Sequence, residues 1–246
     1  MFDSFVPKYK IGCLQPNDVI DNSAYEFYRL APHKIMWVMT NVGLSEFSRE
    51  DVERAFGPID VYLEKLMDRH VDMVMQNGVP LPILIGIEAH DRLLDYMATF
   101  TGLPVTSTVL CVVQATADLG IRRVAIVNKW TAAMNASLAE FYARVGVEVV
   151  GAATKSLQPA DFHRIDTGAQ MQLAYALGKR ALRDHPDCDA LYIGGGSWIA
   201  EPVAQKLEQE YGKPVICNMS AVIRHTLKMF GDWTPIQGHS RLLATA

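Results

Sequence analysis

The sequence contains no long hydrophobic run and no basic cluster, and each absence excludes a class of protein. Nothing in its 246 residues approaches the roughly 18 consecutive apolar residues that span a bilayer. The first ten residues, MFDSFVPKYK, lack the apolar segment of a secretory signal, so we expect a cytoplasmic protein with no membrane partner. The formal net charge is −4 and the basic residues are scattered, which argues against nucleic acid as a partner.

Cysteine is scarce and unpaired. The four cysteines lie far apart and form no CxxC or CxxH motif, which argues against a disulfide framework and against a zinc site: they are Cys13, Cys111, Cys188 and Cys217. We therefore expect reduced thiols and no bound metal.

What the sequence does contain is an alternation of strand and helix patterns. Apolar runs of strand length recur at residues 10–14, 34–40, 72–76, 123–127, 147–152, 189–193 and 214–217. Amphipathic helical patterns lie between them, and the Gly57-Pro58 pair predicts a break that splits one connection into two short helices. This alternation predicts parallel sheets built from βαβ units.

The two parts of the chain also resemble each other. Asp72 precedes Gly78 by six residues, and Asp189 precedes Gly195 by the same number. GLPVTS (102–107) matches GKPVIC (212–217), and KIGCLQPN (10–17) matches RVAIVNKW (123–130). We therefore predict an α/β fold of two pseudo-symmetric open parallel-sheet halves, Rossmann-like or flavodoxin-like. The predicted boundaries are 1–119, with a C-terminal tail of about 226–246, and 120–225.

Two facing halves of this kind enclose one site, because ligands of open parallel sheets bind beyond the carboxyl ends of the strands. Gly78 and Gly195 would then lie on opposite walls. The residues that follow the strands are the candidate substrate-binding residues: Gln15, Asn17, Asn41, Asn77, Val79, Trp130, Gly194, Gly196, Ser197 and Asn218.

The segment GGGS, residues 194–197, has two interpretations. Its amide groups could hold a carboxylate or enolate oxygen, helped by the N-terminus of a helix predicted to begin near Trp198. Alternatively it is a tight turn in which Ser197 caps that helix. A dinucleotide site is not indicated, because GGGSWIAE lacks the GxGxxG spacing.

The side chains near these turns leave similar alternatives open. Lys129 could pair with a substrate carboxylate or act as a base, or it could be a solvated loop lysine. Trp130 could stack on a planar substrate or pack one half on the other. Cys217 ends the last strand, so its thiol could be catalytic or simply buried. His90, His163 and His239 are weaker acid–base candidates.

The paired halves, KIGCLQPN, CDALYIGGG and the block from Pro104 to Phe141 resemble the aspartate/glutamate racemase superfamily. The resemblance is to its arylmalonate decarboxylase and maleate cis–trans isomerase branch. It implies an enzyme without cofactors, whose proton-carrying cysteines would fall on Gly78 and Gly195, neither of which is a cysteine here. It also implies that Val79, Pro80 and Trp130 replace side chains that help to hold a substrate carboxylate.

The expected function is therefore a cofactor-independent isomerase or racemase of a small carboxylate, acting through an enolate-like state. Its candidate catalytic positions are Gly78, Gly195, Lys129 and Cys217. A decarboxylase of an arylmalonate-like acid and a non-catalytic carboxylate-binding protein are the alternatives. The apolar helix expected at 107–119 is compatible with a homodimer.

Overall fold

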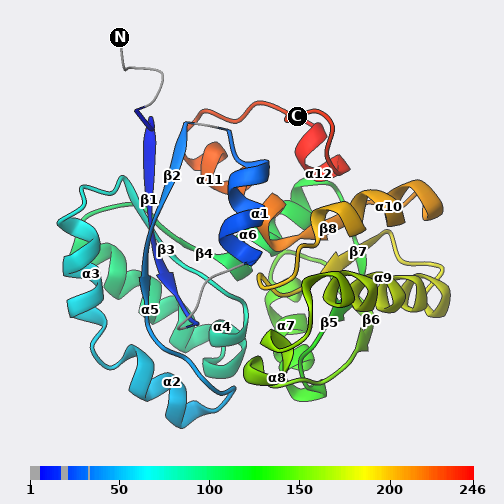
Figure 1. Ribbon diagram of the computed structural model, residues 1–246, viewed down its shortest axis with the longest axis horizontal. Coiled ribbons are helices and arrows are strands. Elements are labelled where there is room, and N and C mark those ends of the chain that lie inside the picture. Colours follow the sequence, from blue (N-terminus) through cyan, green and yellow to red (C-terminus); the bar gives the residue numbers. More distant parts are fainter. Residues whose placement is uncertain (1–5, 18–21, 33) are drawn as a thin grey trace.

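A computed structural model describes residues 6–17, 22–32 and 34–246, and it contains two separate four-stranded parallel sheets (Figure 1). The first sheet has the strand order β2-β1-β3-β4 and the second has the order β6-β5-β7-β8. The two orders are the same when the second half is renumbered, which confirms the predicted pair of α/β halves.

The first half runs from blue through cyan to green in Figure 1. Its elements are β1 (Tyr9–Gln15), α1 (Asn22–Leu30), β2 (Ile35–Asn41), α2 (Arg49–Phe56), α3 (Ile59–Met67), β3 (Met73–Gln76), α4 (Pro80–Ile85), α5 (Ile87–Thr101), β4 (Val105–Ser107) and α6 (Thr108–Asp118). The Gly57-Pro58 break separates α2 from α3, as predicted.

The second half follows the same plan. Its elements are β5 (Arg123–Asn128), α7 (Ala132–Ala143), β6 (Glu148–Thr154), α8 (Pro159–His163), α9 (Thr167–Asp184), β7 (Ala190–Ile193), α10 (Glu201–Tyr211), β8 (Val215–Cys217), α11 (Asn218–Met229) and α12 (Arg241–Ala244). The helix predicted to begin near Trp198 in fact begins at Glu201, because Pro202 fits the first turn of a helix and the preceding glycines do not.

The sequence repeat has a structural cause at the two aspartates. The Asp72 carboxylate accepts the amide N–H of Lys10 at 2.7 Å, and the Asp189 carboxylate accepts that of Arg123 at 2.8 Å. Each aspartate therefore holds the start of the central strand of its sheet. The repeat continues at the other end of the strands, where Asn77 N donates to Leu14 O at 3.0 Å and Gly194 N donates to Val127 O at 2.7 Å.

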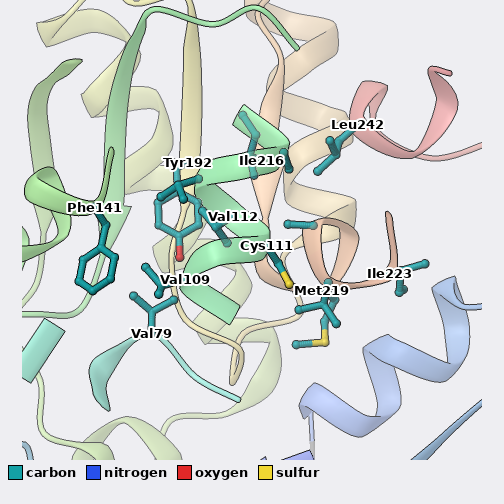
Figure 2. Packing of buried hydrophobic residues seen from close by; sticks show 14 of the residues in the cluster. Val79, Val109, Cys111, Val112, Phe141, Tyr192, Ile216, Met219, Ile223 and Leu242 are labelled. Carbon is teal, nitrogen blue, oxygen red and sulfur yellow. The ribbon is translucent and has the colours of Figure 1, made fainter. Parts of the chain in front are cut away.

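The two halves share one hydrophobic core, and α6 and α11 form its centre. These two helices pack against each other, α1 of the first half packs on α11, and α4 packs on α7 of the second half. Figure 2 shows this core, to which α6 contributes Val109, Cys111 and Val112 and α11 contributes Met219 and Ile223. The apolar face of α6 is thus covered within the chain, which removes the reason for expecting a homodimer.

The C-terminal segment crosses both halves. Asp232 forms ion pairs with Lys8 and Lys34 of the first half, at 2.9 and 3.0 Å. Further on, the Arg224 guanidinium of α11 donates to the carbonyl groups of Leu242 and Thr245, at 3.2 and 2.6 Å. The assignment of this tail to the first half stays a prediction. The predicted domain boundaries stay predictions as well.

Candidate functional site

A cavity lies between the two halves at the carboxyl ends of the strands. Its volume is about 50 Å³, and its lining residues come from both halves: Gln15, Pro16, Asn17, Ser23, Leu44, Phe47, Asn77, Gly78, Pro80, Lys129, Trp130, Phe162, His163, Gly195, Gly196 and Ser197. That volume holds a few water molecules.

The two glycine turns lie on this cavity, one from each half. Gly78 has φ +86° and Gly195 has φ +119°, a region that side chains other than glycine rarely adopt. A Cβ atom on Gly78 would lie 2.9 Å from Cγ of Pro16, and one on Gly195 would lie 2.5 Å from Nε1 of Trp198. Backbone conformation and crowding thus both favour glycine at these positions.

In the turn of the first half, the amide group of Gly78 is hydrogen-bonded within the protein. The N–H of Gly78 donates to Thr108 Oγ1 at 3.0 Å, and the Thr108 hydroxyl donates to Asn77 Oδ1 at 2.8 Å. Asn77 in turn donates from Nδ2 to Gln15 Oε1. The candidate position Gly78 therefore offers no free amide hydrogen to a ligand, because a side chain of the protein accepts it.

The turn of the second half is different. Within residues 6–17, 22–32 and 34–246, no hydrogen bond uses the amide N–H groups of Gly195, Gly196 and Ser197. Two buried side-chain donors beside this turn also have no partner in the described chain: Nε1 of Trp198 and Nδ2 of Asn218. Buried donors without partners are rare in folded proteins. Neither of these side chains lines the cavity, so the donors of this wall that face a ligand are the amide groups of the turn.

Asn218 is held in a defined orientation. The Tyr192 hydroxyl donates to its Oδ1 at 2.7 Å, which leaves the amide nitrogen facing the turn. A Cβ atom on Gly196 would lie 3.8 Å from that nitrogen. Asn218 itself does not line the cavity, so it lies behind the glycine turn and not against a ligand.

Lys129 adds a positive charge to the same wall. It follows β5, and only 4% of its surface is exposed. Its Nζ donates to Ser197 Oγ at 2.7 Å, and it lies 3.1 Å from the ring centroid of Phe162 and 4.9 Å from that of Trp198. The two aromatic faces stabilise the ammonium group by cation–π interactions. Lys129 is thus a buried wall residue and not a solvated loop lysine.

The helix N-terminus behind the turn is occupied by a side chain of the protein. The amide groups of Ala200 and Glu201, where α10 begins, donate to Glu26 Oε1 at 2.7 and 2.8 Å. Burial raises the pKa of the Glu26 carboxyl to about 8. The N-terminus of α10 therefore interacts with Glu26 of α1 and not with a substrate. Ser197 does not cap α10.

Four further predicted residues lie away from the cavity: Asn41, Val79, Gly194 and Cys217. Val79 is buried in the shared core, where Figure 2 shows it beside Val109. The N–H of Gly194 is used in the second sheet, and Trp130 packs over this glycine, with Cη2 2.9 Å from the site of a Cβ atom. Cys217 is fully buried in the second core cluster.

Burial also makes the Cys217 thiol a poor catalytic group. Desolvation and the nearby carboxylates of Glu201, Glu26 and Glu208 hold its pKa well above the usual range. A thiol with a raised pKa is a weak nucleophile and proton donor at neutral pH. The structure thus contradicts the expectation that this thiol reaches the cavity.

Of the three histidine candidates, only His163 lines the cavity. His90 is buried, its Nε2 lies 2.9 Å from Ser107 Oγ, and burial lowers the pKa of its imidazole to about 4. His239 lies near Glu201, with Nδ1 3.9 Å from Oε1, outside the cavity. Among the described residues, no group of three His, Cys, Asp or Glu side chains is arranged to hold a metal ion.

The sequence reasoning missed four lining residues: Ser23, Leu44, Phe47 and Phe162. Leu44 and Phe47 follow β2, and Phe162 follows β6, which is the matching strand of the other half. Ligands of open parallel sheets bind beyond the carboxyl ends of the strands, which we call the strand-end rule. Applied to β6 as well as to the other strands, this rule would have indicated the segment that contains Phe162.

The fold and the cavity together define a two-sheet α/β protein with a cavity between pseudo-symmetric halves. The chain belongs to the arylmalonate decarboxylase family, whose sequence profile matches residues 24–243. The arylmalonate decarboxylase of Bordetella bronchiseptica is 23% identical over 216 residues, which cover 87% of this chain and 88% of that protein.

Solved structures of two kinds of enzyme share the fold. A glycine-to-cysteine, cysteine-to-serine double mutant of arylmalonate decarboxylase in its liganded form has a TM-score of 0.83 at 21% identity, covering 96% of this chain and 98% of that one. A cysteine-to-alanine variant of the maleate isomerase of Pseudomonas putida S16 with maleate has a TM-score of 0.83 at 18% identity, covering 97% and 98%. A cysteine-to-serine variant of the Nocardia farcinica maleate cis–trans isomerase, which carries a covalently bound succinylcysteine intermediate, has a TM-score of 0.80 at 19% identity, covering 96% and 98%. The family and its structural relatives thus contain both decarboxylases and isomerases.

No helix in the described part of the chain is long and apolar enough to cross a membrane.

Proposed function

We propose that this protein removes carbon dioxide from a small activated carboxylic acid, without a cofactor, through an enolate-like state. The observation that carries the proposal is the group of hydrogen-bond donors on one wall of the cavity. The amides of Gly195, Gly196 and Ser197 have no partner in the described chain, and the Lys129 ammonium lies beside them.

Such a wall favours the charge that develops during decarboxylation. When a carboxylate leaves as carbon dioxide, its electron pair stays on the α-carbon and spreads onto the oxygen of the remaining carboxyl group. Fixed donors around that oxygen stabilise the transition state more than the substrate, and the loss of one such donor in known oxyanion holes costs about 3 kcal/mol.

Isomerisation, the leading expectation from the sequence, stays as the second candidate, because it passes through a related enolate-like state and two solved relatives are maleate isomerases. One observation weighs against it. The succinylcysteine in one of those relatives is a covalent bond to a cysteine, whereas none of the described residues that line the cavity here is a cysteine and Cys217 is fully buried.

The lining also favours an acid with an apolar part. In the first half, Pro16, Leu44, Phe47 and Pro80 border the cavity beside four polar residues: Gln15, Asn17, Ser23 and Asn77. An apolar substituent fits against the first group, where a charged end would lose hydration. A malonic acid with an apolar substituent on its central carbon matches both walls.

The test uses a panel of α-substituted malonic acids, with maleate as the isomerisation substrate. We expect release of carbon dioxide from at least one substituted malonate and no conversion of maleate to fumarate. A protein that binds panel members but leaves every one of them unchanged would instead be a carboxylate-binding protein, and the proposal would be wrong.

Ligand binding is measured separately with malonate in a thermal-shift experiment. A ligand at one hundred times its dissociation constant stabilises the native state by about 2.7 kcal/mol, which raises the melting temperature by several degrees. We expect this shift in the unsubstituted protein and in Lys155→Met, an exposed control. It should be lost in Lys129→Met, and an unchanged shift there would contradict the role of Lys129 in anion binding.

A further inference from the structure

The two walls of the cavity are symmetric in backbone but not in chemistry. Laying residues 10–17 over residues 123–130 pairs Pro16 with Lys129, and each follows the central strand of its sheet. Both residues lie close to the glycine of their own half. Proline has no proton to give, whereas the lysine ammonium has three.

Lys129 lies beside the space into which a side chain at position 195 would project. A Cβ atom on Gly195 would be 2.5 Å from Trp198 Nε1 and 3.3 Å from Lys129 Nζ, so the ammonium group lies next to this turn together with the indole. In the first half, the equivalent space beside Gly78 is filled by the ring of Pro16, with Cγ 2.9 Å from the site of a Cβ atom. The site thus has an acid at one turn and a hydrocarbon ring at the other.

Among the described residues, no titratable side chain of the first half corresponds to Lys129 in the cavity. The titratable side chains that line the cavity are Lys129 and His163, and both belong to the second half. Lys129 is the one that contacts the glycine turn, through its hydrogen bond to Ser197 Oγ at 2.7 Å. An enolate oxygen held by the amides of that turn would place the adjacent carbon beside Lys129 Nζ.

We propose that Lys129 delivers the proton that completes the reaction, and that it does so to one face of the substrate only. The proposal rests on the decarboxylation proposed above. Carbon dioxide leaves first, and the electron pair of the broken C–C bond remains on the α-carbon. One N–H bond of the Lys129 ammonium then breaks and a C–H bond forms. The neutral amine recovers a proton from the solvent, so each turnover consumes one proton and releases one carbon dioxide.

One-sided protonation has two consequences. A malonate with two different α-substituents gives one enantiomer of the product in excess. The same site does not racemise that product, because racemisation through two faces needs a second proton carrier opposite Lys129. The geometry therefore separates this protein from a two-base racemase.

The experiment compares Lys129→Arg with the exposed control Lys155→Arg, in deuterium oxide, on a substituted malonate that the unsubstituted protein converts. Arginine keeps the positive charge, but it does not release its proton at the pH of the assay. We expect kcat to fall by about 10²-fold or more, the range of general acid catalysis, while KM changes by less than about threefold. Residual product should lose most of its enantiomeric excess, because water then supplies the proton from either side.

A Lys129→Arg variant that keeps both its kcat and its enantiomeric excess would overturn proton delivery by Lys129, but not the proposed decarboxylation. Loss of both in His163→Gln, with Lys129→Arg intact, would overturn it in favour of His163. If the unsubstituted protein converts no panel member, the proposed function fails and this inference fails with it.

Discussion

Gly78 and Gly195 share a backbone conformation, but they are crowded by different side chains. Next to Gly78 the nearest atom to a Cβ would belong to the Pro16 ring, which cannot rotate away. Next to Gly195 it would belong to the Trp198 indole, which is fully buried. A side chain at either position therefore adds a steric conflict to an unfavourable φ.

We predict that Gly195→Ala destabilises the protein more than a glycine substitution with the same kind of φ and free space. Gly212 is the matched control, since its φ is +69° and nothing lies within 4 Å of the site of its Cβ. The control should lose about 1 kcal/mol, from φ alone, and Gly195→Ala about 2–4 kcal/mol. Urea unfolding measures both, and equal losses would show that the indole moves aside without cost.

At the scale of elements, α1 belongs to one half in sequence but supports the site of the other. Its Asn22 donates from Nδ2 to Ser197 O at 3.0 Å, and its Glu26 accepts the amides that begin α10. These attachments hold the chain at Ser197, the last residue of the turn, and at Ala200 and Glu201 just beyond it. Figure 1 shows α1 lying between the two halves. We infer that α1 holds the donor wall in position.

The buried Glu26 carboxyl predicts a pH dependence of stability. The folded protein keeps this proton up to about pH 8, whereas an exposed glutamate releases it near 4.5. Between these values the native state binds more protons than the unfolded chain, so the unfolding free energy falls as the pH rises and levels off above about 8. One proton corresponds to about 1.4 kcal/mol per pH unit at most.

Glu26→Gln removes this contribution, because glutamine has no proton to release and its Oε1 still accepts two amides. We expect its unfolding free energy to rise relative to the unsubstituted protein at each step from pH 5.5 to 7.5 in urea titrations. Burial also raises the pKa of Glu208, but this carboxyl is present in both proteins and cancels. The control is Glu88→Gln, because the Glu88 side chain is 93% exposed. The prediction would be contradicted if the unfolding free energy of Glu26→Gln changed with pH in parallel with that of the unsubstituted protein.

At the scale of the whole molecule, the halves form one unit because their cores are continuous. α6 and α11 pack against each other, and core side chains from both sheets share one cluster. All four cysteines lie in the buried interior, two in each half: Cys13, Cys111, Cys188 and Cys217. Burial raises the pKa of each of these thiols.

These thiols therefore report on opening of the whole fold. We predict that iodoacetamide labels none of them in the folded protein at neutral pH and leaves decarboxylation unchanged, because the reactive thiolate is neither exposed nor formed. All four should react at denaturant concentrations above the unfolding transition, as measured by mass spectrometry. Rapid labelling of Cys217 in the folded state, with loss of activity, would contradict this prediction and show that the thiol belongs to the site.

Much of the fold was predictable because its signals are local. Apolar runs of four to seven residues between amphipathic patterns indicated the strands, and the repeated Asp-to-Gly spacing indicated two equivalent sheets. The strand-end rule also placed Gln15, Asn77 and Lys129 on one cavity. It was less reliable for Asn41 and Cys217, because a position at a strand end does not say which way the side chain points.

The sequence by itself determined the two halves, the strand ends that meet and the glycines required by a positive φ, since each depends on neighbours a few residues away. Only the tertiary structure decided which donors remain for a ligand. The Gly78 amide is taken by Thr108 and the α10 N-terminus by Glu26, both distant in sequence. Hydrogen-bond partners of this kind are chosen by packing between elements, and no local pattern in the chain records them.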